Sequence, residues 1–319
     1  MNRDYSKHHH RASEYINFDP DDTVPQPVVA TPPAPDEGSK PTGFAFMSFG
    51  SGSSGNCAYL GTFESGILID AGIDPDRVFG ELHRNGVPPQ AVKGIILTHD
   101  HQDHVRYVYA CVRKHKHLRI YCTPKLMNGL LRRHNISRRV RDYHEAIYKE
   151  IPFKLAGMAL TAFETSHDGT DNMGFSIELG AGNTFVVATD TGIITDRASH
   201  YMALASHLMI ESNYDRQLLD TGTYPEYLKA RVRGEKGHLD NRVAADFVAS
   251  HYHDGLQNVF LCHLSNDNNR PEIACDTMSM ALRQRGLTVG DGSNTPDQRG
   301  RDIQVYALPR FKSSHWFML

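Results

Sequence analysis

The chain has 319 residues, of which 39% are hydrophobic and 22% charged, a composition normal for a globular protein with a sizeable core. No apolar run approaches the roughly 18 residues that a membrane helix needs, and the polar N-terminus lacks the apolar stretch of a signal peptide. We therefore expect a cytoplasmic protein without a membrane partner. Five scattered cysteines without a CxxC pair argue against a disulfide framework and a thiolate zinc site, and we expect them to be reduced.

The net charge of -3 conceals an uneven distribution along the chain. Residues 1–42 carry four Lys/Arg and seven Asp/Glu, which accounts for the whole acidic excess. Within the balanced remainder, residues 105–141 hold eleven Lys/Arg and no acidic residue. A basic segment of this kind suits a phosphate backbone, although a solvated helix face would have the same composition.

Residues 1–42 differ from the rest of the chain in composition. They have six prolines between positions 20 and 35, many polar residues and little apolar periodicity. Such a segment buries too little apolar surface to offset the entropy lost on ordering. We predict a disordered N-terminal extension over 1–42 and one folded domain over 43–319.

Apolar periodicity, capping residues and turns place the elements of the folded domain. The first half is expected to hold strands at 44–49, 58–60, 66–69, 94–98, 118–122 and 157–163, and helices at 75–85, 105–117 and 124–134. The second half is expected to hold strands at 173–179, 184–189, 207–210, 258–262 and 303–308, and helices at 196–205, 224–233, 241–251 and 271–285. Hairpins followed by alternating strands and helices predict an α/β or α+β fold with helices outside a central β core.

The segment 95–104 reads Ile-Ile-Leu-Thr-His-Asp-His-Gln-Asp-His, a short apolar strand that runs directly into four ligand-type side chains. Residues two apart in an extended segment point the same way, so His99 and His101 can share one metal ion. The side chains of Asp103 and His104 point in a different direction and can bind a second ion. Core packing does not explain this spacing, which predicts a metal centre.

One pattern recurs five times in the chain. An apolar strand ends, and a ligand-type residue follows at once or within a few positions, at Asp70, His99, His167, Asp190 and His263. Loops at one end of such strands can converge without disturbing the core. We expect these five residues to meet at one edge of the fold.

The second of these five motifs reads Thr-His-x-His-x-Asp-His. The five motifs, in this order, closely resemble those of the metallo-β-lactamase fold superfamily, and the resemblance covers essentially 43–310. The resemblance implies an αββα sandwich, in which two central mixed β-sheets are flanked by helices and carry a two-metal site at their edge. It implies that Asp70 orients the motif loop. The implied metal ligands are His99, His101 and His167 for one ion, Asp103, His104 and His263 for the other, and a bridging Asp190.

Two departures separate this chain from known branches of that superfamily. Flavodiiron members have a glutamate where this chain has His101, and true β-lactamases replace or lack the bridging aspartate and are secreted.

Six nitrogen and oxygen ligands with a bridging carboxylate suit two divalent ions, zinc first and manganese second. Two such ions about 3.5–4 Å apart can share a hydroxide with a pKa near 7 and clamp the oxygens of a phosphodiester. We therefore expect hydrolysis, and count Asp103 among the catalytic residues.

Two further stretches narrow the expected substrate. Residues 210–215 and 237–241 are similar to the glutamate and histidine motifs of the tRNase Z branch. The similarity implies that His238, supported by Glu211, protonates the leaving oxygen. The alternative is that His238 only precedes a helix and that Glu211 is a surface carboxylate.

The segments 51–57, 165–168, 210–213, 237–241 and 263–269 together resemble the YycJ/WalJ group of bacterial metallo-β-lactamase-fold hydrolases, which are described as DNA exonucleases. This chain departs from the group at Asp240, where a serine is usual, and in its N-terminal extension. The resemblance implies a DNA exonuclease. The expected substrate contacts are Ser54, Asn56, Asn213 and Asn268.

Other functions remain open at this level. One alternative is a hydrolase of a small ester, lactone or cyclic phosphodiester, and another is an RNA-processing nuclease of the tRNase Z type. A metal-binding regulator without turnover would usually have lost ligands, and none is missing here.

Overall fold

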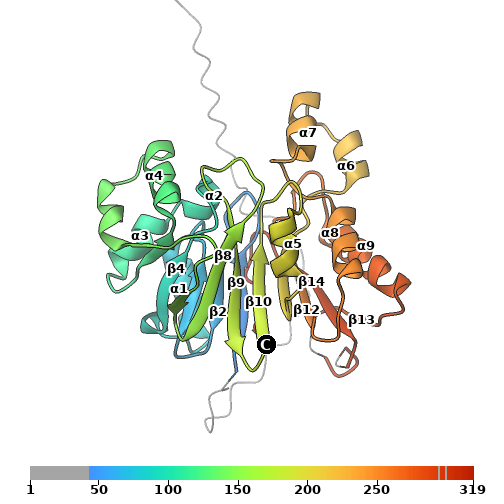
Figure 1. The fold of residues 1–319 in the computed structure, drawn as a ribbon, viewed down its shortest axis with the longest axis horizontal. Coiled ribbons are helices and arrows are strands. Elements are labelled where there is room, and N and C mark those ends of the chain that lie inside the picture. The colour runs from blue at the N-terminus through green and yellow to red at the C-terminus, as the bar shows by residue number, and fades with distance from the viewer. Residues whose placement is uncertain (1–42, 294, 299) are drawn as a thin grey trace, which may run out of the picture. The chain divides into compact units, whose positions relative to one another are not determined.

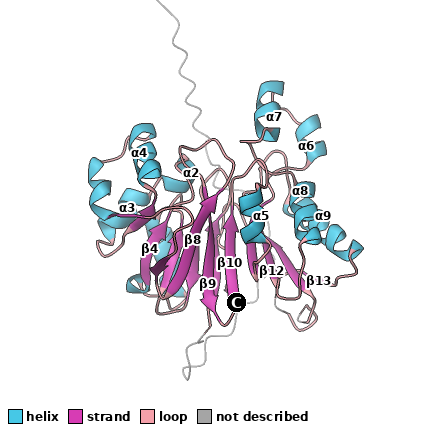
Figure 2. Cartoon of the chain, in the orientation of Figure 1, coloured by secondary structure: helices cyan, strands magenta, loops and turns pink. Residues whose placement is uncertain are grey.

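The computed structural model of the chain describes residues 43–293, 295–298 and 300–319 (Figure 1). The extension predicted to be disordered, 1–42, lies outside the described residues, so the predicted domain boundary stays a prediction. The described residues form two mixed β-sheets with helices around them (Figure 2). This is the predicted α/β architecture of two central sheets flanked by helices.

Both sheets combine antiparallel and parallel pairing. The first has the order β15 (Phe317–Met318), β1 (Ala45–Gly50), β2 (Cys57–Gly61), β3 (Gly66–Ile69), β4 (Val92–Ile96), β5 (Ile120–Cys122) and β6 (His144–Ala146). The second has the order β13 (Val289–Gly290), β14 (Ile303–Ala307), β12 (Asn258–Cys262), β11 (His207–Glu211), β10 (Asn183–Ala188), β9 (Met173–Gly180), β8 (Met158–Glu164) and β7 (Phe153–Leu155). Strands β3 to β6 run parallel, as do β10, β11, β12, β14 and β13. Their carboxyl ends therefore point in a common direction within each sheet.

Strand β10 shows why the fold has layers. Phe185 and Val187 belong to the apolar cluster that also contains Phe46 and Tyr59 of the first sheet, so they fill the space between the sheets. Their neighbour Val186 belongs to a second cluster that includes residues of the covering helices. Side chains alternate between the two faces of a strand, and this strand is buried on both faces, as expected for an inner strand of a sandwich.

The helices lie mainly where they were expected. Their bounds are α1 Pro75–Arg84, α2 Gln102–Val105, α3 Val108–Lys114, α4 Pro124–Arg133, α5 Asp196–Met202, α6 Arg216–Thr221, α7 Glu226–Arg233, α8 Asn241–Ser250 and α9 Pro271–Gln284, with short 3-10 helices at Pro89–Ala91 and Arg138–Tyr143. Asp74 and Asp240 cap α1 and α8 through their side chains. None of the helices among the described residues has the length and apolar character needed to cross a bilayer.

The helices differ from the expectation in two places. The single helix expected over 105–117 is instead α2 and α3, because the Tyr107 amide leaves the helical pattern and donates to the Ala71 carbonyl at 2.9 Å. Helix α6 was not predicted, although Asp215 caps it by accepting a hydrogen bond from the Leu218 amide at 2.9 Å. All five cysteines are free, as expected, and four of them are buried.

Candidate metal centre

Three of the strand-end residues have a backbone conformation that is uncommon outside glycine. Asp70 follows β3, Asp190 lies two residues beyond β10, and His263 follows β12, with φ angles of 61°, 47° and 53°. At each position the chain turns sharply as it leaves the sheet. Non-glycine residues with this left-handed backbone conformation cluster at functional sites, where the surrounding structure supports the strain.

Asp70 fixes the loop that carries the first four ligand-type residues. Its two carboxylate oxygens each accept a hydrogen bond from Thr98 at 2.8 Å, one from the amide and one from the hydroxyl. One of these oxygens also lies 2.7 Å from Nδ1 of His104. Because Nδ1 of His104 contacts Asp70, its Nε2 faces the centre, where it lies 2.9 Å from Nδ2 of Asn56.

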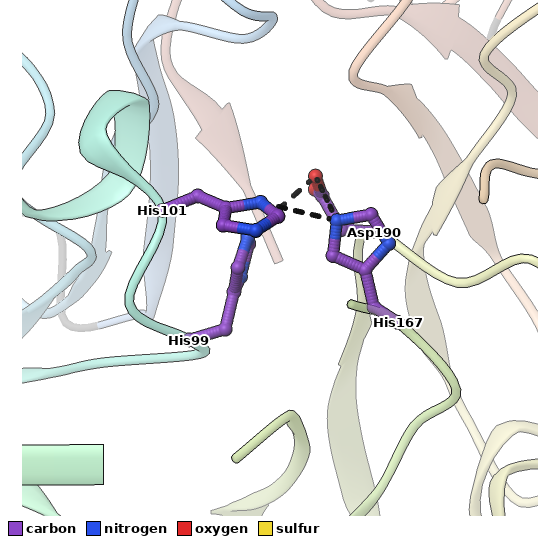
Figure 3. A group of neighbouring side chains, drawn as sticks. All are labelled: His99, His101, His167 and Asp190. Atoms are coloured by element: carbon purple, nitrogen blue, oxygen red, sulfur yellow. Dashed lines mark hydrogen bonds and ion pairs between the residues drawn. The ribbon is translucent and has the colours of Figure 1, made fainter. Parts of the chain in front are cut away.

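The first group of ligand atoms comes from His99, His101, His167 and Asp190 (Figure 3). Nε2 of His167 lies 3.2 Å from Nδ1 of His101 and 3.7 Å from Oδ2 of Asp190, and the ligand atoms of all four residues lie within 4.8 Å of one another. Two ligand atoms on one tetrahedral zinc ion, each about 2.1 Å from it, are about 3.4 Å apart. The group therefore has the spacing of a single metal site.

The second group comes from Asp103, His104 and His263. Oδ2 of Asp103 lies 3.5 Å from Nε2 of His104 and 3.3 Å from Nε2 of His263. Asp190 reaches this group as well, because its Oδ1 lies 3.4 Å from His104 and its Oδ2 lies 3.5 Å from His263. One carboxylate thus lies between the two groups, where a bridging ligand has to be.

The chemistry of these donors fits divalent cations. Nε2 of His99 is buried and has no hydrogen-bond partner among the described residues, although it points into the group of Figure 3. Burial lowers the pKa of His99 well below its usual range, so this nitrogen offers a lone pair. Burial alone would raise the pKa of Asp190, but His263 and His104 hold it well below its usual range, so this carboxylate is ionised. A buried nitrogen without a partner beside a buried carboxylate is satisfied by a metal ion.

Glu211 and His238 meet beside this centre. Glu211, the last residue of β11, is fully buried, and its Oε1 lies 2.7 Å from Nδ1 of His238 and 3.2 Å from Nδ1 of His263. Its Oε2 accepts a hydrogen bond from the Thr191 amide at 2.7 Å. Burial opposes its charged form, but the interaction with His238 lowers the pKa of Glu211 below its usual value. The alternative that Glu211 is a surface carboxylate was therefore wrong.

The structure also adds a residue, Asp168, to which the sequence assigned no role. Asp168 places Oδ1 at 3.0 Å from Nε2 of His101, and its Oδ2 accepts two hydrogen bonds from the Arg231 guanidinium, at 3.2 and 2.8 Å. This contact turns Nδ1 of His101 toward His167. The signals in the sequence were that Asp168 directly follows His167 and ends the segment 165–168, which contributes to the family resemblance.

We expect the substitution Asp168→Ala to lower the affinity for the ion that His101 is predicted to bind about 10- to 100-fold, because partners of this kind orient metal ligands. Competition with a chromogenic chelator measures the affinity of each ion. Asp246→Ala, at an exposed position of α8, is the matched control. Equal affinities in Asp168→Ala and the control would show that His101 needs no such support.

The four expected substrate contacts lie in different surroundings. Ser54 is exposed, whereas Asn56 is buried and its Nδ2 donates to Oδ2 of Asp103 at 3.1 Å. Nδ2 of Asn213 donates to the His263 carbonyl at 2.7 Å, and Asn268 is buried next to Ser265. Asn56 and Asn213 thus contact residues of the centre, and a direct contact of any of the four with substrate stays a prediction.

Comparison with known proteins shows the family to which this chain belongs. The family model of the β-lactamase superfamily domain matches residues 66–259, and the chain belongs to this superfamily. Within it, the chain is 31% identical to the exodeoxyribonuclease YycJ of Bacillus anthracis over 256 residues, which cover 80% of this chain and 95% of the relative. It is 30% identical to the exodeoxyribonuclease WalJ of Streptococcus pneumoniae over 249 residues, which cover 78% and 91%. The predicted resemblance to the YycJ/WalJ group is confirmed, and the chain is a metal-dependent hydrolase of this superfamily.

Solved structures show the same fold at lower identity. The metallo-β-lactamase fold protein YhfI from Bacillus subtilis has a TM-score of 0.57 and 15% identity, with 86% of this chain and 99% of that chain covered. Unliganded yeast PDE1 has a TM-score of 0.58 and 11% identity, with 85% and 99% covered. These similarities confirm the predicted fold class.

Proposed function

We propose that this protein is a two-metal nuclease that hydrolyses the phosphodiester bonds of DNA from an end. The observation that carries the proposal is the contact between Glu211 and His238 beside the predicted metal ligands. The His238 ring centre lies 5.0 Å from that of His167 and 5.3 Å from that of His263. A general acid has to lie close to the reacting group, and His238 is next to one predicted ligand of each ion. The YycJ and WalJ relatives, which are named exodeoxyribonucleases, support DNA as the substrate.

The residues assigned to the two ions suit zinc first and manganese second, because they offer only imidazole nitrogens and carboxylate oxygens. When bound, the ions supply Lewis acidity, which polarises the phosphodiester and lowers the pKa of an attacking water. The ligands of the first ion are His99, His101 and His167. Those of the second are Asp103, His104 and His263, and Asp190 contacts both groups.

His238 supplies the second half of the reaction in this proposal. Its Nδ1 is engaged by Glu211, so its Nε2 is free to hold a proton toward the substrate. The ionised Glu211 fixes the orientation of the ring through this contact. The side chain of His238 is 22% exposed, so an incoming phosphodiester can reach it. The proton passes from Nε2 to the leaving oxygen as the bond breaks.

Incubation with end-labelled single- and double-stranded DNA and with RNA tests the proposal. We expect stepwise release of nucleotides from DNA, loss of cleavage after a chelator, and recovery when zinc or manganese is added back. Preferential cleavage of RNA would favour a function of the tRNase Z type instead. Turnover of a small ester, lactone or cyclic phosphodiester without cleavage of any nucleic acid would contradict the proposal.

A further inference from the structure

A cavity of about 580 Å³ opens between α3 and α4, next to the short helix α2. Its floor is apolar and includes Val105, Leu130 and Ile136, with the half-buried ring of Tyr109 beside them. Its rim carries Arg106 and Arg113. Figure 1 shows α3 and α4 on one side of α2 and the pair α6 and α7 on the other. The volume lies in the range of sites that hold small ligands.

The cavity wall is joined to the loop that carries the predicted metal ligands. Gln102, which lines the cavity, lies in the chain between His101 and Asp103. His134, at the far wall, has Nε2 at 2.6 Å from the carbonyl oxygen of Asp100, the residue between His99 and His101. A ligand in the cavity would therefore lie close to the metal centre.

The charge around the cavity is positive and only partly balanced. Asp100 pairs with Arg133 at 3.0 Å, which holds that guanidinium in the wall. Among the described residues, the Arg106 side chain makes one hydrogen bond, to the Ser54 carbonyl oxygen at 3.3 Å, and Arg113 has no hydrogen-bond or ion-pair partner. None of the residues that line the cavity is acidic. Exposed guanidinium groups without carboxylate partners favour an anion, and the guanidinium fork matches the geometry of a phosphate.

An apolar floor with an aromatic ring favours a different kind of group. Bases of single-stranded nucleic acid stack on such rings, with little dependence on sequence. A nucleotide offers both groups, a phosphate for the arginines and a flat ring for Tyr109. The cavity therefore combines the two recognition elements that single-strand-binding proteins use.

We propose that this cavity is a subsite for one nucleotide of the substrate strand, next to the bond that is cut. This subsite rests on the proposed function and describes how the protein binds the DNA strand. Arg106 and Arg113 bind its backbone phosphate, and the Tyr109 ring contacts its base. The acid-free segment 105–141 supplies all of these groups.

The substitutions Arg113→Gln and Tyr109→Leu test this subsite in the full, metal-loaded chain. We expect each to raise KM for a single-stranded oligonucleotide about tenfold, with a smaller effect on kcat. Arg113→Gln should also reduce the slope of log affinity against log salt by about 0.7, because one phosphate contact is lost. Arg132→Gln is the matched control, since Arg132 is exposed on α4 and does not line the cavity. It should keep the wild-type KM and salt slope.

Binding measured by fluorescence anisotropy in the presence of a chelator separates this inference from the proposed function. Unchanged oligonucleotide affinity and KM in Arg113→Gln overturn the subsite, even if the wild type cleaves DNA. A wild type that binds DNA without cleaving it overturns the proposed function, and the affinities of the variants then decide the subsite. Because Arg113 is exposed, its substitution decides the question if Tyr109→Leu fails to fold, as judged by circular dichroism.

Discussion

Replacing Asp190 by asparagine is expected to abolish metal-dependent cleavage, with a fall in kcat on the order of 1,000-fold or more. The carboxylate lies within 3.4 to 3.7 Å of His104, His263 and His167, so it faces both groups of ligand atoms. Asparagine has nearly the same shape and tolerates the φ of 47° at this position, so the backbone is kept while the negative charge is lost. Steady-state assays with end-labelled DNA and metal analysis of the purified variant check the result.

The matched control for this substitution is Asp246→Asn, which changes an exposed aspartate on α8. We expect it to retain the wild-type kcat and the wild-type metal content. The Asp190→Asn variant should bind fewer ions than the wild type. Full activity of Asp190→Asn with manganese or zinc would refute the bridging role.

The second large loss of activity is expected for the substitution His238→Gln. We expect kcat on DNA to fall about 100- to 10,000-fold, because the leaving oxygen loses its proton donor. A phosphodiester with a nitrophenyl leaving group should be affected far less, because that group departs without a proton. Metal content should not change, since His238 is not among the residues assigned to either ion. The comparison of the two substrates separates proton transfer from a general loss of structure.

His200→Gln, at an exposed position of α5, is the control for this experiment and should behave as the wild type on both substrates. Glu211→Gln gives a different result, because Glu211 also contacts Nδ1 of His263 at 3.2 Å. We expect it to lower both kcat and the affinity for the ion that His263 is predicted to bind. An equal loss on both substrates in His238→Gln would mean that His238 is not the proton donor.

The parts of the centre that could be predicted from sequence are those that local chain geometry determines. Asp70, Asp190 and His263 each follow an apolar strand, and parallel strands bring their carboxyl ends to one edge. Asp168 was missed because its partner His101 is 67 residues away, and only the path of two loops brings the side chains together. No local pattern encodes that contact.

The fold shows the same division between local and distant interactions. Capping by Asp74 and Asp240 is local, and the helices that these residues begin were predicted within one residue. The division of 105–117 into α2 and α3 depends on the hydrogen bond from Tyr107 to Ala71, which lies 36 residues earlier in the chain. Apolar spacing continues across this break, so periodicity alone could not locate it.

Anomalous diffraction at the zinc edge from crystals of the zinc-loaded protein tests the two-metal centre most directly. We predict two ions per chain, one bound by His99, His101 and His167, and the other by Asp103, His104 and His263, with Asp190 in contact with both. Glu211 and His238 also lie close enough to Asp190 and His263 to form a metal site. A single ion, or an ion bound by Glu211 and His238, would contradict a two-metal centre with these ligands.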